Sequence, residues 1–333
     1  MTHGRAITRG ATLLVIAVLP LALLIRSTRG LPPATPNAPG TFAFGAFGDA
    51  PYDPLESGRY PLMLEDLDQH DLDFAIQVGD IFWRPCSAER YQRSLHWFEQ
   101  RKHPLIYVPG DNEWADCWTA QEGGFNPRDR LALLRRIMYP RPGFALGLER
   151  FPLETQSTDP QYSEFVEHTR WSSNGIAFAT LHVVGSGNFT EPFPARTAED
   201  DAETRRRLES ALAWLRGTFA QAISQSANAV VVAFHADPGF GWSSANPFRP
   251  LLDAFAEEAT AFGKPVLLIH GDSHEFITDT PLRAPSSGQT ITNVTRLEVP
   301  GSPDVGWVRV VVAKGPTPSF SFEQRVVPFW KYW

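Results

Sequence analysis

The sequence has few cysteines, no dense cluster of basic residues and no internal repeat. Only two cysteines, Cys86 and Cys117, occur in 333 residues, and their spacing lacks the CxxC form of a zinc or redox site. Basic residues gather only in short pieces such as residues 205–207, and the formal net charge is -7. A dedicated nucleic-acid surface needs clustered cations to neutralise phosphates, so the sequence predicts no such surface.

The sequence also lacks an apolar run long enough for a comfortable membrane span near its start. Residues 11–25 form an apolar run with arginines on both sides. A run of about fifteen residues suits the core of a signal peptide better than a transmembrane helix. We therefore predict that residues 1–30 are a signal peptide or, because no clean cleavage site follows, an N-terminal membrane anchor. The flanking arginines disfavour a buried core helix. The proline-rich residues 31–40 are predicted to be a linker.

These features predict an exported protein, periplasmic or extracellular, that contacts a membrane only through its N-terminal segment. In an oxidising compartment, a pair of cysteines favours one disulfide between Cys86 and Cys117. Closing a loop of about 31 residues would stabilise the fold by roughly 3–4 kcal/mol in the chain-entropy model. Two buried free thiols remain the alternative interpretation.

Residues 41–325 are predicted to form one α/β domain, followed by a tail at residues 326–333. Short runs rich in Val, Ile and Phe indicate strands that are buried on both faces. They are residues 42–47, 74–78, 105–108, 176–184, 229–234 and 266–269. Helical spacing of apolar residues predicts helices at residues 88–101, 202–220 and 250–262. Three further strands, at residues 290–297, 307–312 and 319–322, follow without helices between them.

Carboxylates and histidines follow five of the buried strands directly. In chain order the segments are Gly48-Asp49, Gly79-Asp80, Gly110-Asp111-Asn112-Glu113, His235 and His270-Gly271-Asp272-Ser273-His274. The carboxyl ends of strands form one edge of an open α/β sheet, where ligand sites are built. Each segment alone is a common turn, but buried carboxylates that converge need a compensating charge. Together the five segments predict a metal cluster at this edge.

These motifs resemble those of the calcineurin-like metallophosphoesterases, which carry GD, GD, GNH(E/D), His and GHxH at successive strand ends. The resemblance covers nearly the whole globular part of the chain. It implies a four-layer αββα fold, a β-sandwich flanked by helices, and two divalent ions. It assigns Asp80 as the bridging ligand and Asn112 to the position of the catalytic histidine. The metal ligands that it implies are Asp49, Asp80, Asp111, His235, Asp272 and His274.

The chain departs from the family pattern at the first motif and at the catalytic position. The usual DxH histidine is missing after Asp49, and Tyr52 or Asp53 could take its place. In purple acid phosphatases a tyrosine three residues after the bridging aspartate serves instead, but here that position is Trp83, which cannot ligate. One metal position therefore has a full set of ligands, and the other has three clear ones. The protein could bind two ions or only one.

Replacing the catalytic histidine by Asn112 removes a general acid near the leaving group. Such an acid typically contributes ~10²–10⁴-fold to the rate. The candidates to replace it are Glu113, Asp116, His182 and His270. For the two histidines, a core role without catalytic function is an equally good interpretation. Residues 185–188 (Gly-Ser-Gly-Asn) follow a strand and are interpreted as a turn, at the same edge or elsewhere.

The predicted ligand set is unusually acidic, because aspartates stand where the family has an asparagine and a histidine. Four aspartates carry a formal charge of about -4, which two divalent ions would only neutralise. A trivalent ion, a diester substrate or slow catalysis would each fit this charge. Oxygen-rich ligation favours Mn, Fe, Mg or Ca over Zn.

The leading hypothesis is therefore a metal-dependent phosphoesterase that hydrolyses phosphate mono- or diesters of small molecules. The alternative is a catalytically weak or inactive metal-stabilised module that binds a phosphorylated ligand or a protein.

Overall fold

The structure, a computed structural model, describes residues 33–241 and 243–329. The predicted signal peptide or anchor, residues 1–30, lies outside these ranges, as do residues 330–333 of the predicted tail. Residues 33–40 of the predicted linker form neither helix nor strand. Among the described residues, no helix combines the length and the apolar character that crossing a membrane requires.

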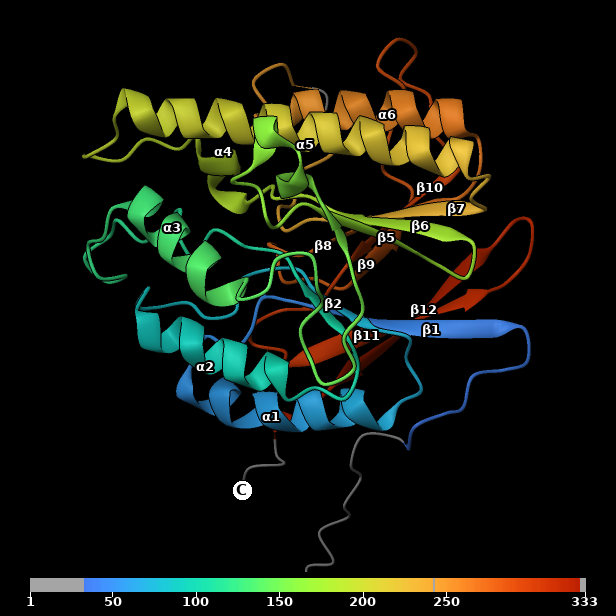
Figure 1. Ribbon diagram of the computed structural model, residues 1–333, viewed down its shortest axis with the longest axis horizontal. Helices are drawn as coiled ribbons and strands as arrows, with labels where there is room; N and C mark the ends of the chain where they lie inside the picture. The colour runs from blue at the N-terminus through green and yellow to red at the C-terminus, as the bar shows by residue number, and fades with distance from the viewer. Residues whose placement is uncertain (1–32, 242, 330–333) are drawn as a thin grey trace, which may run out of the picture.

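Two β-sheets pack face to face, and helices cover their outer faces (Figure 1). The first sheet contains, in spatial order, β12 (Ser319–Val326), β11 (Gly306–Ala313), β1 (Thr41–Phe47), β2 (Ala75–Gln77) and β3 (Leu105–Tyr107). The second contains β4 (Glu154–Thr155), β5 (Thr169–Ser173), β6 (Ile176–Thr180), β7 (Ala229–Ala233), β8 (Val266–His270), β10 (Val294–Glu298) and β9 (Ile277–Asp279).

The helices divide between the two sheets. Those that share an apolar cluster with the first sheet are α1 (Pro54–Gln69), α2 (Ala88–Glu99) and α3 (Pro127–Met138). Those packed on the second sheet are α5 (Ala198–Ser224) and α6 (Arg249–Phe262). The short elements are α4 (Gly185–Phe189) and two 3-10 turns, Gln156–Thr158 and Pro160–Tyr162. This arrangement confirms the predicted αββα fold.

Strand β1 shows how the buried strands produce three apolar layers. Phe42 and Phe44 point into the layer between the sheets, whereas Ala43 and Phe47 point toward the helices. Side chains alternate between the two faces of a strand, so a strand covered on both faces needs apolar residues at nearly every position. The near-continuous apolar runs of the sequence therefore mark the central strands.

Parallel pairing brings the predicted motifs to one edge of the molecule. Strands β1, β2 and β3 are parallel neighbours, and so are β6, β7 and β8. The segments after β1, β2 and β3 carry Asp49, Asp80 and Asp111, and those after β7 and β8 carry His235 and Asp272. The carboxyl ends of the parallel strands in both sheets thus face the same site.

Three strand boundaries were predicted wrongly, among them the end of β12, which was expected at residue 322 and lies at Val326. The strand expected over residues 176–184 ends at Thr180, because the carbonyl of Val183 leaves the ladder and accepts hydrogen bonds from the backbone N–H groups of His235 and Ala236. The strand expected from residue 290 begins at Val294.

Helices α1 and α3 were not predicted from the sequence. Both start after a side-chain cap followed by proline: Asp53 accepts from the Glu56 N–H, and Asn126 accepts from the Asp129 N–H. Pro61 lies inside α1. A proline in a sequence usually indicates the end of a helix, which is why α1 was not predicted.

Candidate metal centre

Six predicted ligands lie around one buried site. Carboxylate and imidazole atoms of Asp49, Asp80 and His235 all lie within 4.8 Å of one another, and so do those of Asp111, His235 and Asp272. His274 joins the first group, with its Nε2 3.9 Å from Oδ1 of Asp49. The structure therefore brings the whole predicted set together, with His235 shared between the two groups.

Hydrogen bonds to backbone carbonyls orient both histidines toward the carboxylates. The Nδ1–H of His235 donates to the Val78 carbonyl oxygen at 2.8 Å, and that of His274 donates to the Ser302 oxygen at 2.9 Å. A carbonyl can only accept, so each ring carries its proton on Nδ1 and presents Nε2 to the site. Metal-binding histidines are held in this way, because the free Nε2 lone pair then points at the ion.

The carboxylates around His235 are closer than buried anions tolerate without a cation. Its Nε2 lies 2.8 Å from Oδ1 of Asp111, 3.4 Å from Oδ1 of Asp80 and 3.7 Å from Oδ1 of Asp272. Burial raises the pKa of Asp49 to about 8 and that of Asp272 to about 6. Burial also raises the pKa of Asp80 well above its usual value.

Two further observations show that the residues fit a cation. Among the described residues, no hydrogen-bond partner reaches the buried Oδ2 of Asp49. Burial would lower the pKa of His235, but the charge of Asp80 and the hydrogen bond to Asp111 outweigh it and raise that pKa well above its usual value. Without an ion, the site must retain protons to offset its negative charge. Divalent or trivalent cations would replace these protons and be coordinated by Oδ2 of Asp49.

The backbone is strained at four of the predicted ligands. Asp49, Asp80, Asp272 and His274 have φ angles of 54°, 55°, 81° and 67°. The left-handed region costs about 1 kcal/mol or more for a residue with a Cβ, and it persists only where the surroundings impose it. Such strain concentrates at functional sites, and here it turns the ligands into the site at the ends of the strands.

Two glycines allow the backbone to approach the carboxylates. A Cβ on Gly271 would lie 2.1 Å from Oδ2 of Asp49. A Cβ on Gly185 would lie 2.6 Å from Oδ1 of Asp272 and 2.7 Å from Oδ1 of Asp111. Any larger residue at either position would displace a ligand.

Residues 185–189 form a left-handed turn against the metal-site carboxylates. Ser186, Gly187 and Asn188 have φ angles of 49°, 61° and 58°. The Ser186 hydroxyl lies 3.1 Å from Oδ2 of Asp111 and 2.7 Å from Oδ1 of Asp116. The sequence analysis expected a turn here and left its position open, and the structure places it at the site.

Arg207 of α5 holds this turn in place. Its fully buried guanidinium donates to the carbonyl oxygen of Asn188 at 3.1 Å and also to the Oδ1 of that residue. It donates as well to the His182 carbonyl oxygen at 3.2 Å and lies 5.1 Å from the ring centroid of Trp114. Several hydrogen bonds from one buried guanidinium fix the backbone of this turn, and its strained conformation is retained for that reason.

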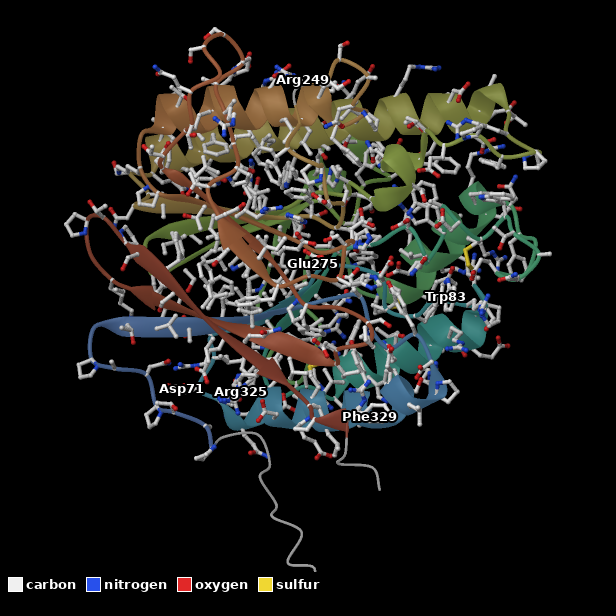
Figure 2. The ribbon with its side chains drawn as sticks, turned by 180° about the vertical axis from the view of Figure 1, so that it is seen from behind. Asp71, Trp83, Arg249, Glu275, Arg325 and Phe329 are labelled. Atoms are coloured by element: carbon white, nitrogen blue, oxygen red, sulfur yellow. A yellow bond between two sulfur atoms is a disulfide. The ribbon has the colours of Figure 1, made fainter. Side chains whose placement is uncertain are left out.

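Tyr52 is the residue that the structure places where the first-motif histidine is missing. Its hydroxyl donates to Oδ2 of Asp80 at 2.6 Å, and its ring meets His274 edge-on at 5.2 Å between centroids. Asp53 instead caps α1, accepting from the Glu56 N–H at 2.8 Å. Trp83 lies 6.3 Å from the Tyr52 ring and is 41% exposed, on the same side of the molecule as the disulfide (Figure 2). Of the two candidates, only Tyr52 faces the ligands.

Asn112 also contacts the predicted bridging residue. Its side-chain amide donates to Oδ2 of Asp80 at 2.6 Å, and its backbone N–H donates to Oδ1 at 3.1 Å. Among the four candidates for a replacement acid, Asp116 is connected to the site through the Ser186 hydroxyl. Burial raises the pKa of Asp116 to about 7.

The other three candidates are fully buried, and each has a hydrogen-bond partner that is not one of the predicted ligands. Glu113 accepts from the Ile81 N–H and the Tyr107 hydroxyl. His182 donates to Glu167, and the Nδ1 of His270 lies 2.9 Å from the Gly271 carbonyl oxygen.

The two cysteines form the predicted disulfide, with Cα atoms 5.8 Å apart. It links the loop after β2 to the loop after β3. The sulfur atoms of Cys86 and Cys117 lie 3.3 Å and 3.7 Å from the Asn112 carbonyl oxygen. The bridge therefore supports the segment that carries Asn112.

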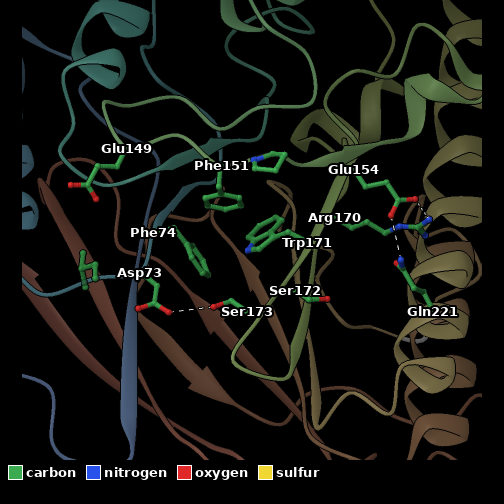
Figure 3. A pocket seen from close by; sticks show the side chains of 12 residues that line it. Asp73, Phe74, Glu149, Phe151, Glu154, Arg170, Trp171, Ser172, Ser173 and Gln221 are labelled. Atoms are coloured by element: carbon green, nitrogen blue, oxygen red, sulfur yellow. Dashed lines mark hydrogen bonds and ion pairs between the residues drawn. The ribbon is translucent and has the colours of Figure 1, made fainter.

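A cavity of about 740 Å³ opens at the opposite end of the strands (Figure 3). Phe74, which precedes β2, lines it, whereas Asp80 follows β2. Its aromatic rings pack on one another, with 5.4 Å between the centroids of Phe74 and Trp171. The charged Arg170 beside them is paired with Glu154. None of the predicted ligands lines this cavity, so it is separate from the metal centre.

Comparisons with known proteins agree with this architecture. The chain is similar to a solved structure titled "Structure of PhoD", with a TM-score of 0.53 and 13% sequence identity. The similarity covers 88% of this chain and 70% of that chain. No protein-family model and no curated protein matches the chain. At this identity the likeness concerns the fold, and the site must be argued from its own residues.

Proposed function

We propose that this chain is an exported metal-dependent phosphoesterase that hydrolyses phosphate mono- or diesters of small molecules. The observation that carries the proposal is the convergence of four aspartates and two oriented histidines at the carboxyl ends of both sheets. The fold that this chain shares with PhoD supports the same function class. The buried Cys86–Cys117 disulfide supports export, since disulfides persist in oxidising compartments.

The ligands divide into two positions. The first would be held by Asp49, Asp80 and His274, with Tyr52 as a fourth ligand. The second would be held by Asp80, Asp111, His235 and Asp272. When bound, two ions would polarise a phosphoryl oxygen and lower the pKa of a water molecule, which is the chemistry that such pairs supply.

Tyr52 changes the charge balance of the site. As a phenolate it would bring the ligand set to a formal charge of about -5, which one trivalent and one divalent ion would neutralise. A mixed pair of this kind is the cofactor we favour. Mn, Fe, Mg and Ca suit these oxygen-rich ligands better than Zn.

The remaining residues bind the substrate and handle protons. Asn112 can donate a hydrogen bond to a phosphoryl oxygen from its amide. Asp116 and the Ser186 hydroxyl form a hydrogen-bonded pair beside Asp111, which is the one route among the described residues from a candidate acid to the ligands. We assign proton transfer to the leaving alcohol to this pair.

Metal analysis and turnover test the proposal together. The purified protein should contain metal, and activity toward phosphate mono- or diesters should disappear with a chelator and return with individual metals. A protein that binds no metal, or a metal-loaded protein that hydrolyses no phosphate ester, would contradict the proposal.

Asn112 also favours a second function, a metal-stabilised module that binds a phosphorylated ligand or a protein without efficient turnover. An amide cannot replace the imidazole acid, whose loss typically costs ~10²–10⁴-fold in rate. Asn112→His should raise turnover of phosphate esters if the site is catalytic, with Asn112→Gln as the matched control. Binding of a phosphate ester with no turnover in either variant would support the binding module.

A further inference from the structure

We propose that a pocket formed by the loops beside the metal centre binds an apolar, flat group on the alcohol side of the substrate. The substrates would then be amphiphilic phosphate esters. This inference rests on the phosphoesterase function proposed above. The pocket has a volume of about 540 Å³, and its walls include Trp118, Phe125, Pro127, Phe193 and Pro194.

Both walls of the pocket start at the metal-site carboxylates. Trp118 directly follows Cys117, whose sulfur lies 3.7 Å from the carbonyl oxygen of Asn112. On the other wall, Phe193 stacks on Phe189 at 5.7 Å between centroids. Phe189 ends the left-handed turn that begins at the carboxylates of Asp111 and Asp272. Both walls of the pocket therefore continue segments that contact the metal-site residues.

The lining of the pocket selects apolar groups. Its lining residues include no Asp, Glu, Lys or Arg. The guanidinium groups of Arg130 and Arg196 lie over the rings of Phe125 and Phe193, 4.3 Å and 5.7 Å from their centroids, so the lining itself offers mainly aromatic and other apolar surface to a ligand. Trp118 is 36% exposed and stacks on Phe193 with ring planes 19° apart and centroids 5.7 Å apart. Exposed aromatic residues in a concave apolar site mark places where ligands bind.

Covalent and hydrogen bonds within the chain fix the loop that forms the first wall. The disulfide ties Cys117 to Cys86, and the Phe125 N–H donates to the Cys117 carbonyl oxygen at 2.8 Å. The Gly124 N–H donates to the Thr119 carbonyl oxygen at 2.8 Å. Binding in a preformed pocket spends little free energy on ordering the protein.

The position of the pocket decides which part of the substrate it takes. Hydrolysis adds the oxygen of water to phosphorus, breaks the bond between phosphorus and the ester oxygen, and releases the alcohol with one proton. Asp116, which with Ser186 is assigned the proton transfer to the leaving alcohol, precedes Trp118 by two residues on the same loop. The alcohol would therefore extend toward Trp118 while the phosphoryl group stays at the ligands.

Matched substrates test the pocket directly in the metal-loaded protein. Wild-type kcat/KM should be about 10–100-fold higher for 3-phenylpropyl phosphate than for ethyl phosphate, or for the corresponding methyl diesters. Trp118→Ala should lower this ratio to about 1, and Trp118→Phe should retain most of it. Ile223→Ala removes a side chain that is 52% exposed on α5 and should leave the ratio unchanged. A wild-type ratio near 1, or a ratio that Trp118→Ala does not lower, would overturn the inference.

Binding separates a failure of this inference from a failure of the proposed function. The probes are 3-phenylpropyl phosphonate and ethyl phosphonate, measured by calorimetry. One outcome is that no ester is hydrolysed, but 3-phenylpropyl phosphonate binds more tightly than ethyl phosphonate and Trp118→Ala removes the difference. The pocket inference is then supported and the enzymatic function is wrong. If both esters are hydrolysed equally and both phosphonates bind equally, the function stands and the pocket inference is wrong.

Discussion

Two clusters of buried carboxylates in this chain differ in what neutralises them. Glu167 is fully buried and lies 2.5 Å from Nη2 of Arg135 and 2.7 Å from Nδ1 of His182. Burial alone would raise the pKa of Glu167, but the charge of Arg135 and the hydrogen bond from His182 outweigh it. The pKa of this carboxyl is therefore held well below its usual value. Here the chain supplies its own cation.

Asp49, Asp80 and Asp111 of the metal site are also buried, and Asp272 is partly buried, with its side chain 26% exposed. In the described ranges, their ion pairs involve only His235 and His274, and no Lys or Arg. The pKa values of Asp49 and Asp80 are raised by burial, in contrast to that of Glu167. Burial of acidic residues therefore does not mark a metal site. Several buried carboxylates that converge on one site without an arginine or lysine do.

The strongest test of this contrast removes one carboxylate from each cluster. Asp80→Ala should lose both ions, because Asp80 is shared by the two positions, and activity should fall by at least ~10²-fold. Glu167→Gln should keep its metal, since Glu167 contacts none of the ligands. Metal content measured by mass spectrometry after desalting distinguishes them. Full metal content in Asp80→Ala would refute the assignment of the ligands.

Removing the internal cation should destabilise the fold without changing metal binding. Arg135→Met leaves Glu167 buried with the His182 hydrogen bond but without its cation, which costs about 3–5 kcal/mol in the free energy of unfolding. The control is Arg206→Met, which breaks the exposed pair with Glu164 and should cost no more than ~1 kcal/mol. Urea unfolding of both variants provides the measurement. Equal losses in the two variants would contradict the structural role of the Glu167–Arg135 pair.

Tyr52→Phe should weaken metal binding at the first position alone. Removing the hydroxyl deletes the proposed fourth ligand, and loss of about 10–100-fold in affinity for one of two ions is expected. Tyr162→Phe, at a partly exposed tyrosine far along the chain, is the matched control. Reconstitution with ferric iron adds a second readout, because charge transfer from a phenolate ligand to ferric iron absorbs visible light. A visible band that survives in Tyr52→Phe would exclude this ligand.

A buried histidine outside the metal centre should make stability depend on pH. Burial lowers the pKa of His168 to about 3, so the unfolded chain takes up its proton near pH 6.5 while the folded chain does not. The unfolded state then binds more protons, and stability is complete above about pH 6.5 and falls as pH drops toward about 3.

His168→Asn should flatten this dependence. Between pH 7.5 and 5.0 the variant should lose about 2 kcal/mol less than the wild type. Urea unfolding in the presence of a chelator at both pH values measures the difference without a contribution from metal binding. Identical pH slopes would show that His168 is protonated in the folded protein.

The sequence was sufficient to predict nine of the strands in the described residues and the edge at which they deliver their ligands, but not β4, β5 and β9. Runs such as residues 229–234 are apolar throughout because both faces of the strand are covered, and that pattern is local. Aspartates and histidines after such runs must then meet at one edge. The ligand set followed from this geometry together with the family resemblance.

The features that sequence reasoning missed depend on contacts between distant segments. The left-handed turn at Ser186 is held by Arg207, which belongs to the following long helix. Whether Tyr52 or Asp53 faces the ligands is decided by the start of α1, which uses Asp53 as its cap. The Asp53-Pro54 pair was a readable helix start, and its recognition would have left Tyr52 as the remaining candidate.

The pairing of β1 with β11 has a consequence for how the site is assembled. Residues 41–46 pair antiparallel with residues 308–313, so the strand that carries Asp49 lacks one neighbour until nearly the whole chain has been made. Contacts this distant in sequence form slowly, because a long loop must close before they add stability. The first metal position can therefore be completed only after synthesis reaches the last hairpin. In an exported protein, the ions would then be acquired in the compartment where the chain finishes folding.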